Sequence, residues 1–221
     1  MKNLHFFAFV LFLGLTMGSS CKKDSAATKA GDAATAAVAP SNSTTYKINP
    51  AASSVTWTGS KVVGDKHQGK FKISDGSISV KDGNIEAGSF VIDMNSLTVT
   101  DLEGEAKGKL EGHLKSPDFF DVATHGKGTF TITACQKVSG TPNVTHKVTG
   151  NLKMKNIAKS VSFNADLNIG KSKIMAVTPE FKINRNDWGI VYNNKTIAGV
   201  AKDYVINDDV ALVVNLAGTA Q

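Results

Sequence analysis

Cysteine, proline and tyrosine are scarce in this chain of 221 residues, which has two cysteines, five prolines and three tyrosines. With Cys21 and Cys135 as the only cysteines, the sequence excludes a small domain held together by several disulfides. We predict that Cys135 is a small, half-buried apolar residue without a redox role, which is typical of an unpaired cysteine.

Recognisable catalytic and metal-binding motifs are also missing. No Gly-x-Ser-x-Gly elbow supplies the nucleophile of an acyl hydrolase, and no glycine-rich phosphate loop opens a helix. His67, His113, His125 and His146 are dispersed, without the short spacings of a zinc site. The sequence therefore predicts a protein that is not an enzyme, with no metal site and no cofactor.

Charge is neither abundant nor concentrated, with a formal net charge of +6. The lysines are not interleaved with aromatic residues as in nucleic-acid-binding segments. Nucleic acid is therefore excluded as the expected partner. A moderately basic surface agrees better with a position near anionic lipid head groups. The alternative is an ordinary solvated barrel exterior, which would have the same composition.

The N-terminus has the pattern of a targeting segment. Lys2 is followed by the apolar run Leu4–Met17, which is too short to span a bilayer comfortably, and then by Gly18-Ser19-Ser20-Cys21. This pattern resembles a bacterial lipoprotein signal, with residues 1–20 removed and Cys21 lipidated to anchor the protein in a membrane of the cell envelope. The alternative is an ordinary secretory signal that is cleaved nearby.

The next segment, up to residue 45, consists mainly of Ala, Thr, Ser, Gly and Asp. Such a composition has little apolar surface to bury, so we predict a flexible tether over residues 21–45. The folded domain is predicted to span residues 46–217.

Within this domain, apolar and polar residues alternate with a period of two. The runs include Val55/Trp57, Phe71/Ile73, Ile78/Val80 and Val210–Leu216. Each run gives a strand with one apolar and one polar face. Turn signals separate the runs, for example at 74–76, 81–83 and 170–172. The pattern predicts an all-β fold, an antiparallel barrel of about eight strands.

One segment, Leu102–Lys115, departs from this period. Leu102, Ala106, Leu110 and Leu114 recur every four residues, and several Glu-to-Lys pairs stand four residues apart, which predicts a marginal helix held by packing. It is followed by Ser116-Pro117, where we predict that Ser116 caps a new turn. The helical excursion, residues 102–122, therefore ends with the adjacent aromatics Phe119 and Phe120.

Four motifs in this order resemble those of the YceI-like family. They are His113–Val122 (HLKSPDFFDV), Val148–Lys159, Phe181–Ile190 (FKINRNDWGI) and Val205–Leu212. The resemblance implies a lipocalin-like barrel with an apolar interior that binds polyisoprenoid or other long-chain amphiphilic lipids, in the bacterial envelope. A quinone-like lipid belongs to the same class of ligand.

A barrel of about eight strands either fills with side chains or holds one slender ligand. If it is hollow, we predict that the lipid contacts Trp57, Phe71, Phe90, Ile92, Phe119, Phe120, Phe130, Ile132, Leu152, Met154, Phe163, Leu167, Phe181 and Trp188. Phe119 and Phe120 would then close or flank the mouth. For any single residue, the alternative is a side chain that only fills the core.

The motifs single out two polar residues, His113 and Arg185. Arg185 either binds a lipid phosphate through its planar guanidinium or anchors a loop through Asp187 or a backbone carbonyl. His113 either binds a head group or fixes the turn between Lys115 and Asp118.

Two other classes of function stay open at this point. One is a structural or protein-interaction barrel with a solid core, and the other is an envelope enzyme acting on a quinone or isoprenoid substrate. The sequence also leaves open whether the chain forms a homodimer.

Overall fold

A computed structural model describes residues 26–199 and 201–221. The expected signal segment and Cys21 lie outside the described residues. The described chain contains eleven strands, one α-helix and two short 3₁₀ turns. They are β1 (Gly31–Asp32), β2 (Thr44–Ile48), η1 (Pro50–Ala52), β3 (Ser54–Ser60), β4 (Lys66–Lys81), β5 (Asn84–Val99), α1 (Gly104–Lys115), β6 (Lys127–Lys137), β7 (His146–Met154), β8 (Ile157–Ile169), β9 (Lys173–Val177), β10 (Phe181–Asn184), η2 (Arg185–Trp188) and β11 (Asp209–Ala220).

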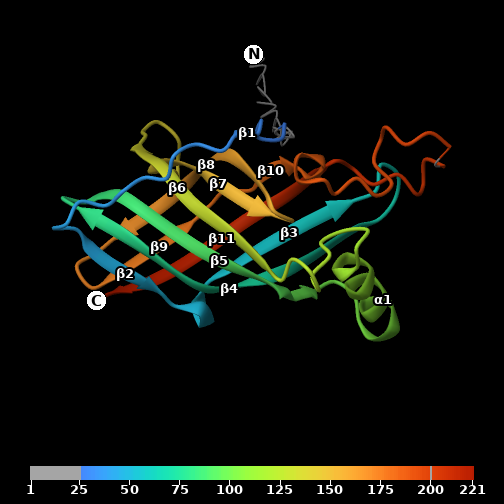
Figure 1. The fold of residues 1–221 in the computed structure, drawn as a ribbon, viewed down its shortest axis with the longest axis horizontal. Helices are drawn as coiled ribbons and strands as arrows, with labels where there is room; N and C mark the ends of the chain where they lie inside the picture. Colours follow the sequence, from blue (N-terminus) through green and yellow to red (C-terminus); the bar gives the residue numbers. More distant parts are fainter. Residues whose placement is uncertain (1–25, 200) are drawn as a thin grey trace, which may run out of the picture.

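The strands form one antiparallel sheet that closes on itself as a barrel (Figure 1). From β8 the sheet runs through β7, β6, β5 and β4 to β2 and β3, both of which pair with β11. The short strand β9 pairs with both β11 and β8 and closes the ring. The predicted all-β barrel is confirmed, with eleven strands in place of about eight, because short strands such as β1, β9 and β10 complete the seam.

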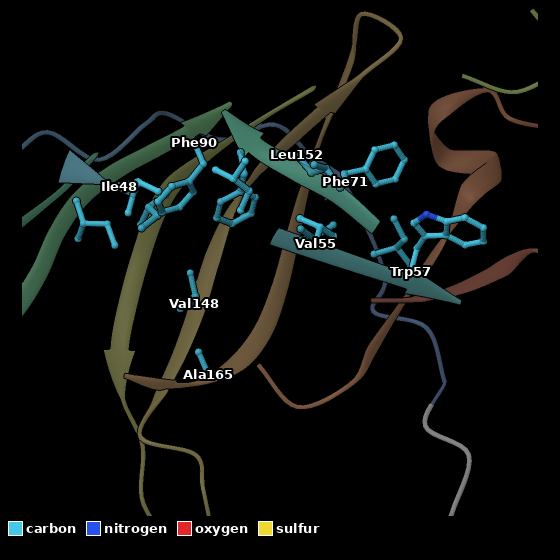
Figure 2. Packing of buried hydrophobic residues seen from close by; sticks show 14 of the residues in the cluster. Ile48, Val55, Trp57, Phe71, Phe90, Val148, Leu152 and Ala165 are labelled. Carbon is cyan, nitrogen blue, oxygen red and sulfur yellow. The ribbon is translucent and has the colours of Figure 1, made fainter. Parts of the chain in front are cut away.

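The alternating pattern places apolar side chains inside the barrel (Figure 2). In β4, Phe71 and Ile73 are buried at odd-numbered positions, whereas Ile78 and Val80 are buried at even-numbered ones. The predicted turn at 74–76 is wrong, because the strand continues there through a β-bulge, with a register shift between Ile73 and Asp75. The extra residue reverses which side chains face inward, as a bulge does.

Gly76 is required at this bulge. A Cβ at Gly76 would lie 2.6 Å from the carbonyl oxygen of Ser89, and its φ of 155° suits glycine. By contrast, the turn predicted at 81–83 is present. Asp82 and Gly83, with φ of 50° and 73°, connect β4 and β5 as a tight hairpin.

The described part of the predicted tether lies on the barrel wall instead of extending from it. Thr28 donates its N–H to the Lys182 carbonyl of β10 at 2.7 Å and its hydroxyl to the Ser162 carbonyl of β8 at 3.0 Å. The following strand β1 pairs with β8. The exposed edge of β8 offers unpaired backbone groups, and these bind a segment that has little apolar surface of its own.

The helix α1 lies at one end of the barrel, beside the long loop that precedes β11 (Figure 1). It begins at Gly104, two residues after the predicted start, and ends at Lys115 as predicted. Leu110 and Leu114 pack against the barrel core, while the Glu105–Lys109 ion pair, 2.6 Å between Oε1 and Nζ, lies in solvent. Packing by these two leucines therefore positions α1 over the barrel end.

Candidate functional site

The barrel contains an internal cavity of about 400 Å³ at the end where α1 lies. Its wall is formed by side chains of β3, β4, β5, β7 and β11, together with α1 and the loop 189–208. Exposed residues such as Asp65 and Tyr204 also line it, so the cavity opens to solvent at this end. We call this opening the mouth.

A second cavity, of about 90 Å³, lies deeper in the barrel. Val55, Ile92, Leu152 and Leu212 line both cavities, so the smaller one continues the larger. Thr178 is the one polar residue that the described chain contributes to the deep cavity. Polar groups therefore gather at the mouth, and the far end of the hollow is apolar.

The residues predicted to contact a lipid divide between the two cavities, with a single exception. The larger cavity is lined by Trp57, Phe71, Phe119, Phe120 and Met154; the smaller by Phe90, Phe130, Ile132, Phe163, Leu167 and Phe181; and both by Ile92 and Leu152. Trp188 lines neither. Its ring is fully buried, and Nε1 donates to the Leu152 carbonyl at 3.0 Å, so Trp188 belongs to the packing outside the hollow.

Four aromatic rings form a row along the deep cavity. Phe90 stacks on Phe130 with ring centroids 6.3 Å apart, and Phe130 lies 5.4 Å from Phe163. Phe163 in turn stacks on Phe181 at 4.5 Å. Stacked and tilted arrangements at these separations are favourable for aromatic pairs. All four rings of this row, Phe90–Phe130–Phe163–Phe181, line the smaller cavity.

The adjacent aromatics after α1 line the mouth side of the larger cavity, where the sequence predicts them. Phe119 is buried, and its carbonyl accepts a hydrogen bond from Lys155 Nζ at 2.7 Å. Phe120 meets Phe71 edge to face, with centroids 5.5 Å apart. These rings cover the gap between α1 and the barrel wall.

The turn that carries these rings is built from backbone bonds. The Ser116 carbonyl accepts from the N–H groups of Phe119 and Asp121, at 3.1 and 2.9 Å. Asp121 takes a left-handed conformation, with φ of 46°. The predicted side-chain cap by Ser116 is wrong, because its hydroxyl is buried without a hydrogen-bond partner and the backbone closes the turn instead.

His113 lies at the mouth between two aromatic rings. Its imidazole meets Phe119 and Tyr192 edge to face, with centroids 5.0 and 4.7 Å away. Its Nε2 lies 3.6 Å from a carboxylate oxygen of Asp118. His113 therefore connects α1, the turn and the loop 189–208, and it also faces the cavity.

Arg185 anchors the loop that borders the mouth. Its guanidinium donates to the carbonyls of Ile190, Ile206 and Asn207, at 2.8, 3.3 and 3.1 Å. Burial lowers the pKa of Arg185 from its ordinary value, although the nearby Asp208 opposes this shift. The loop-anchoring alternative accounts for these contacts, with backbone carbonyls as acceptors in place of Asp187.

Comparison with known proteins identifies the family. Residues 46–217 match the YceI-like domain. The chain belongs to the YceI-like family.

A UPF0312 protein of Ectopseudomonas mendocina (strain ymp) is 32% identical over 105 residues, which cover 48% of this chain and 51% of that protein. The matched part thus spans about half the length of this relative. Among solved structures, Burkholderia cenocepacia BcnA has a TM-score of 0.61 at 18% identity, covering 77% of this chain and 98% of that one. A polyisoprenoid binding domain from Saccharophagus degradans, implicated in plant cell wall breakdown, has a TM-score of 0.56 at 18% identity, covering 80% and 98%. These likenesses show the fold.

Sequence reasoning missed the mouth residues of this YceI-like barrel that come from the loop 189–208. Tyr192, Asn193, Tyr204 and Ile206 line the larger cavity, yet they belong to no alternating run. Tertiary contacts alone bring this loop beside β3 and α1. The available signal was its composition, with two tyrosines and several apolar residues in a segment without strand period.

Residues 26–199 and 201–221 contain no group of three or more metal-ligating side chains and no helix long and apolar enough to cross a membrane. Cys135 is half-buried and unpaired, and burial raises the pKa of its thiol to about 11. A thiol with this pKa is almost entirely protonated near neutral pH and hence a poor nucleophile.

Proposed function

We propose that this YceI-like protein binds a long-chain amphiphilic lipid, a polyisoprenoid or a quinone-like molecule, and carries or stores it without catalysis. The tail would lie along the barrel axis and the polar head at the mouth. The observation that carries the proposal is the apolar cavity of about 400 Å³, which is within the usual range for small-molecule sites, about 300–1,000 Å³.

The energetics of such binding follow from the lining. Each methylene group transferred from water into an apolar cavity contributes about 0.8 kcal/mol. The deep end offers almost no polar partner, so this term would dominate for the tail. His113 and Tyr192 lie at the mouth, where their polar atoms can meet a head group.

Similarity to a solved polyisoprenoid binding domain supports the choice of ligand class. The sequence pattern around Cys21 supports a location in the bacterial envelope, with lipidated Cys21 as the membrane anchor. In this arrangement the barrel would stay close to the membrane that supplies or receives its ligand.

Native mass spectrometry and solvent extraction of freshly purified full-length protein test the proposal. We expect a co-purified lipid of one or a few masses. The informative variant is Gly59→Phe, because Gly59 lines the larger cavity and a Cβ there meets no atom within 4 Å. A phenyl ring at this position should fill the mouth, so we expect the lipid content to fall at least several-fold without loss of folding.

The matched control is Gly108→Phe, an exposed position on α1 that also has open space around its Cβ. This variant should retain its lipid. If the unmodified protein repeatedly contains no lipid, the carrier proposal is refuted and a structural barrel is favoured. Turnover of a quinone or isoprenoid substrate that a His113 substitution abolishes would favour the enzyme.

A further inference from the structure

The mouth is bordered by apolar side chains that face solvent. In the loop between β3 and β4, Val62 and Val63 are 44% and 54% exposed. In the loop 189–208, Val191, Ile197 and Tyr204 are 47%, 42% and 63% exposed. Single exposed apolar residues are ordinary on protein surfaces, but several on the two loops around one opening form a patch that fits an apolar partner.

Hydrogen bonds join these two loops into one structure. The Val62 N–H donates to the Val205 carbonyl at 2.8 Å, and the Asn207 N–H donates to the Ser60 carbonyl at 2.9 Å. The Asn207 side chain adds a bond to the Lys61 carbonyl at 2.9 Å. Together with the bonds from Arg185, they hold the two loops beside one another. We call residues 61–66, 189–199 and 201–208 the mouth lip.

The mouth lip carries slightly more basic than acidic side chains, four lysines against three aspartates. Its basic side chains outside the buried Arg185–Asp208 contact are Lys61, Lys66, Lys195 and Lys202. The corresponding acidic side chains are Asp65, which pairs with Lys61 at 3.3 Å, and Asp203. Exposed apolar side chains on loops that also carry lysines are typical of protein surfaces that bind in the head-group region of an anionic bilayer.

We propose that the mouth lip docks on the surface of an anionic lipid bilayer, with Val62, Val63 and Tyr204 entering the head-group region. The larger cavity would then open directly onto the membrane. A lipid could move between bilayer and barrel without its tail crossing water, because the residues that touch the membrane also line or adjoin the mouth. This inference rests on the proposed lipid-binding function.

The test uses the full chain with the substitution Val62→Cys, which carries an environment-sensitive dye. A second substitution, Cys21→Ser, leaves one other thiol. That thiol, Cys135, is half-buried with a pKa raised to about 11, so it should label poorly. The control position is Val138→Cys, 37% exposed in the connection between β6 and β7, at the opposite end of the barrel (Figure 1). Vesicles contain phosphatidylcholine, phosphatidylglycerol and a lipid with a quencher on its acyl chain.

We expect the dye at residue 62 to be quenched at least three-fold more than the dye at residue 138. Adding Tyr204→Asp, or omitting phosphatidylglycerol, should remove most of this difference. Because the readout is specific to each site, attachment of the N-terminus to the vesicle cannot produce it. Equal quenching at the two positions, or none at residue 62, would overturn the docking proposal.

Lipid extraction from the same preparation separates this inference from the proposed function. A barrel that contains lipid but shows no quenching at residue 62 overturns docking and leaves lipid binding intact. A barrel without lipid overturns the proposed function, and selective quenching at residue 62 would then still show that the mouth lip meets the bilayer.

Discussion

Phe163 of β8 and Phe181 of β10 stack with their ring centroids 4.5 Å apart and their planes inclined by 16°. These two strands do not pair with each other within the described part of the chain. Thr28 connects them, because it donates one hydrogen bond to a backbone carbonyl of each strand. The ring stack therefore covers from the inside the part of the seam, between β8 and β10, that β9 does not reach. It also ends the aromatic row along the smaller cavity.

Removing one ring of this stack should lengthen the hollow. We expect Phe181→Ala to lower the free energy of unfolding by about 3 kcal/mol, as for other large-to-small changes at packed aromatic positions. The lipid recovered from the variant should shift toward longer chains. Urea denaturation and mass spectrometry of extracted lipid measure the two effects. Val177→Ala, at an exposed position of β9, is the control and should change neither.

The two tryptophans should respond differently to the same change. Trp188→Phe removes the Nε1 donor from the buried Leu152 carbonyl, so we expect a loss of about 1–3 kcal/mol in unfolding free energy, with lipid content unchanged. Trp57 lines the larger cavity, and its Nε1 is buried without a hydrogen-bond partner. Trp57→Phe should therefore cost less stability and alter lipid retention. The opposite ranking in thermal or urea unfolding would contradict this assignment.

Arg185 should be needed for order in the mouth lip. A lysine cannot reach the carbonyls of Ile190, Ile206 and Asn207 together, so Arg185→Lys leaves buried acceptors unpaired. We expect a loss of at least about 2 kcal/mol and faster amide hydrogen exchange over residues 190–207. Lys195→Met, an exposed change in the same loop, provides the comparison. Exchange rates that are equal in the two variants would rule out this bracing role.

Acid should weaken the attachment of α1 to the barrel. The Val99 N–H donates to Glu111 Oε1 at 2.8 Å and the Thr98 hydroxyl donates at 3.1 Å, and these bonds lower the pKa of Glu111 from its ordinary 4.5. Because the folded-state pKa is below the unfolded one, the carboxylate stabilises the fold above about pH 4.5 and this contribution is lost as the pH falls further.

Glu111→Gln removes the titrating group. Below about pH 4.5 its unfolding free energy should therefore fall less steeply with pH than that of the natural chain. Urea denaturation at a series of pH values measures both slopes. Identical slopes would show that Glu111 contributes nothing to the acid sensitivity of the fold.

Much of the architecture could be read from the sequence because strand residues alternate strictly between two faces. Runs such as Phe71/Ile73 and Val210–Leu216 lie in strands with their apolar side chains inward, and α1 ends at the predicted residue. The prediction was wrong at 74–76, where residues typical of a turn form a β-bulge inside one strand. Local residue preference cannot distinguish these outcomes when pairing with a neighbouring strand decides between them.

For the site, residue type predicted which side chains are apolar and face inward. It did not predict which of them line a cavity and which pack against other side chains. Trp188 resembles the lining residues in the sequence, yet it packs outside the hollow. The mouth residues of the loop 189–208 carry no period, because their positions depend on Arg185 and on contacts with the β3–β4 loop.

The sequence by itself determined the antiparallel β class, the helical excursion and the apolar character of the interior, since these follow from side-chain period and composition. Only the tertiary structure decided that the barrel keeps a hollow, where the hollow opens and which residues border it. Whether inward-facing rings meet or leave space depends on the curvature of the closed sheet and on loops that join across the mouth. Neither is encoded in any short stretch of residues.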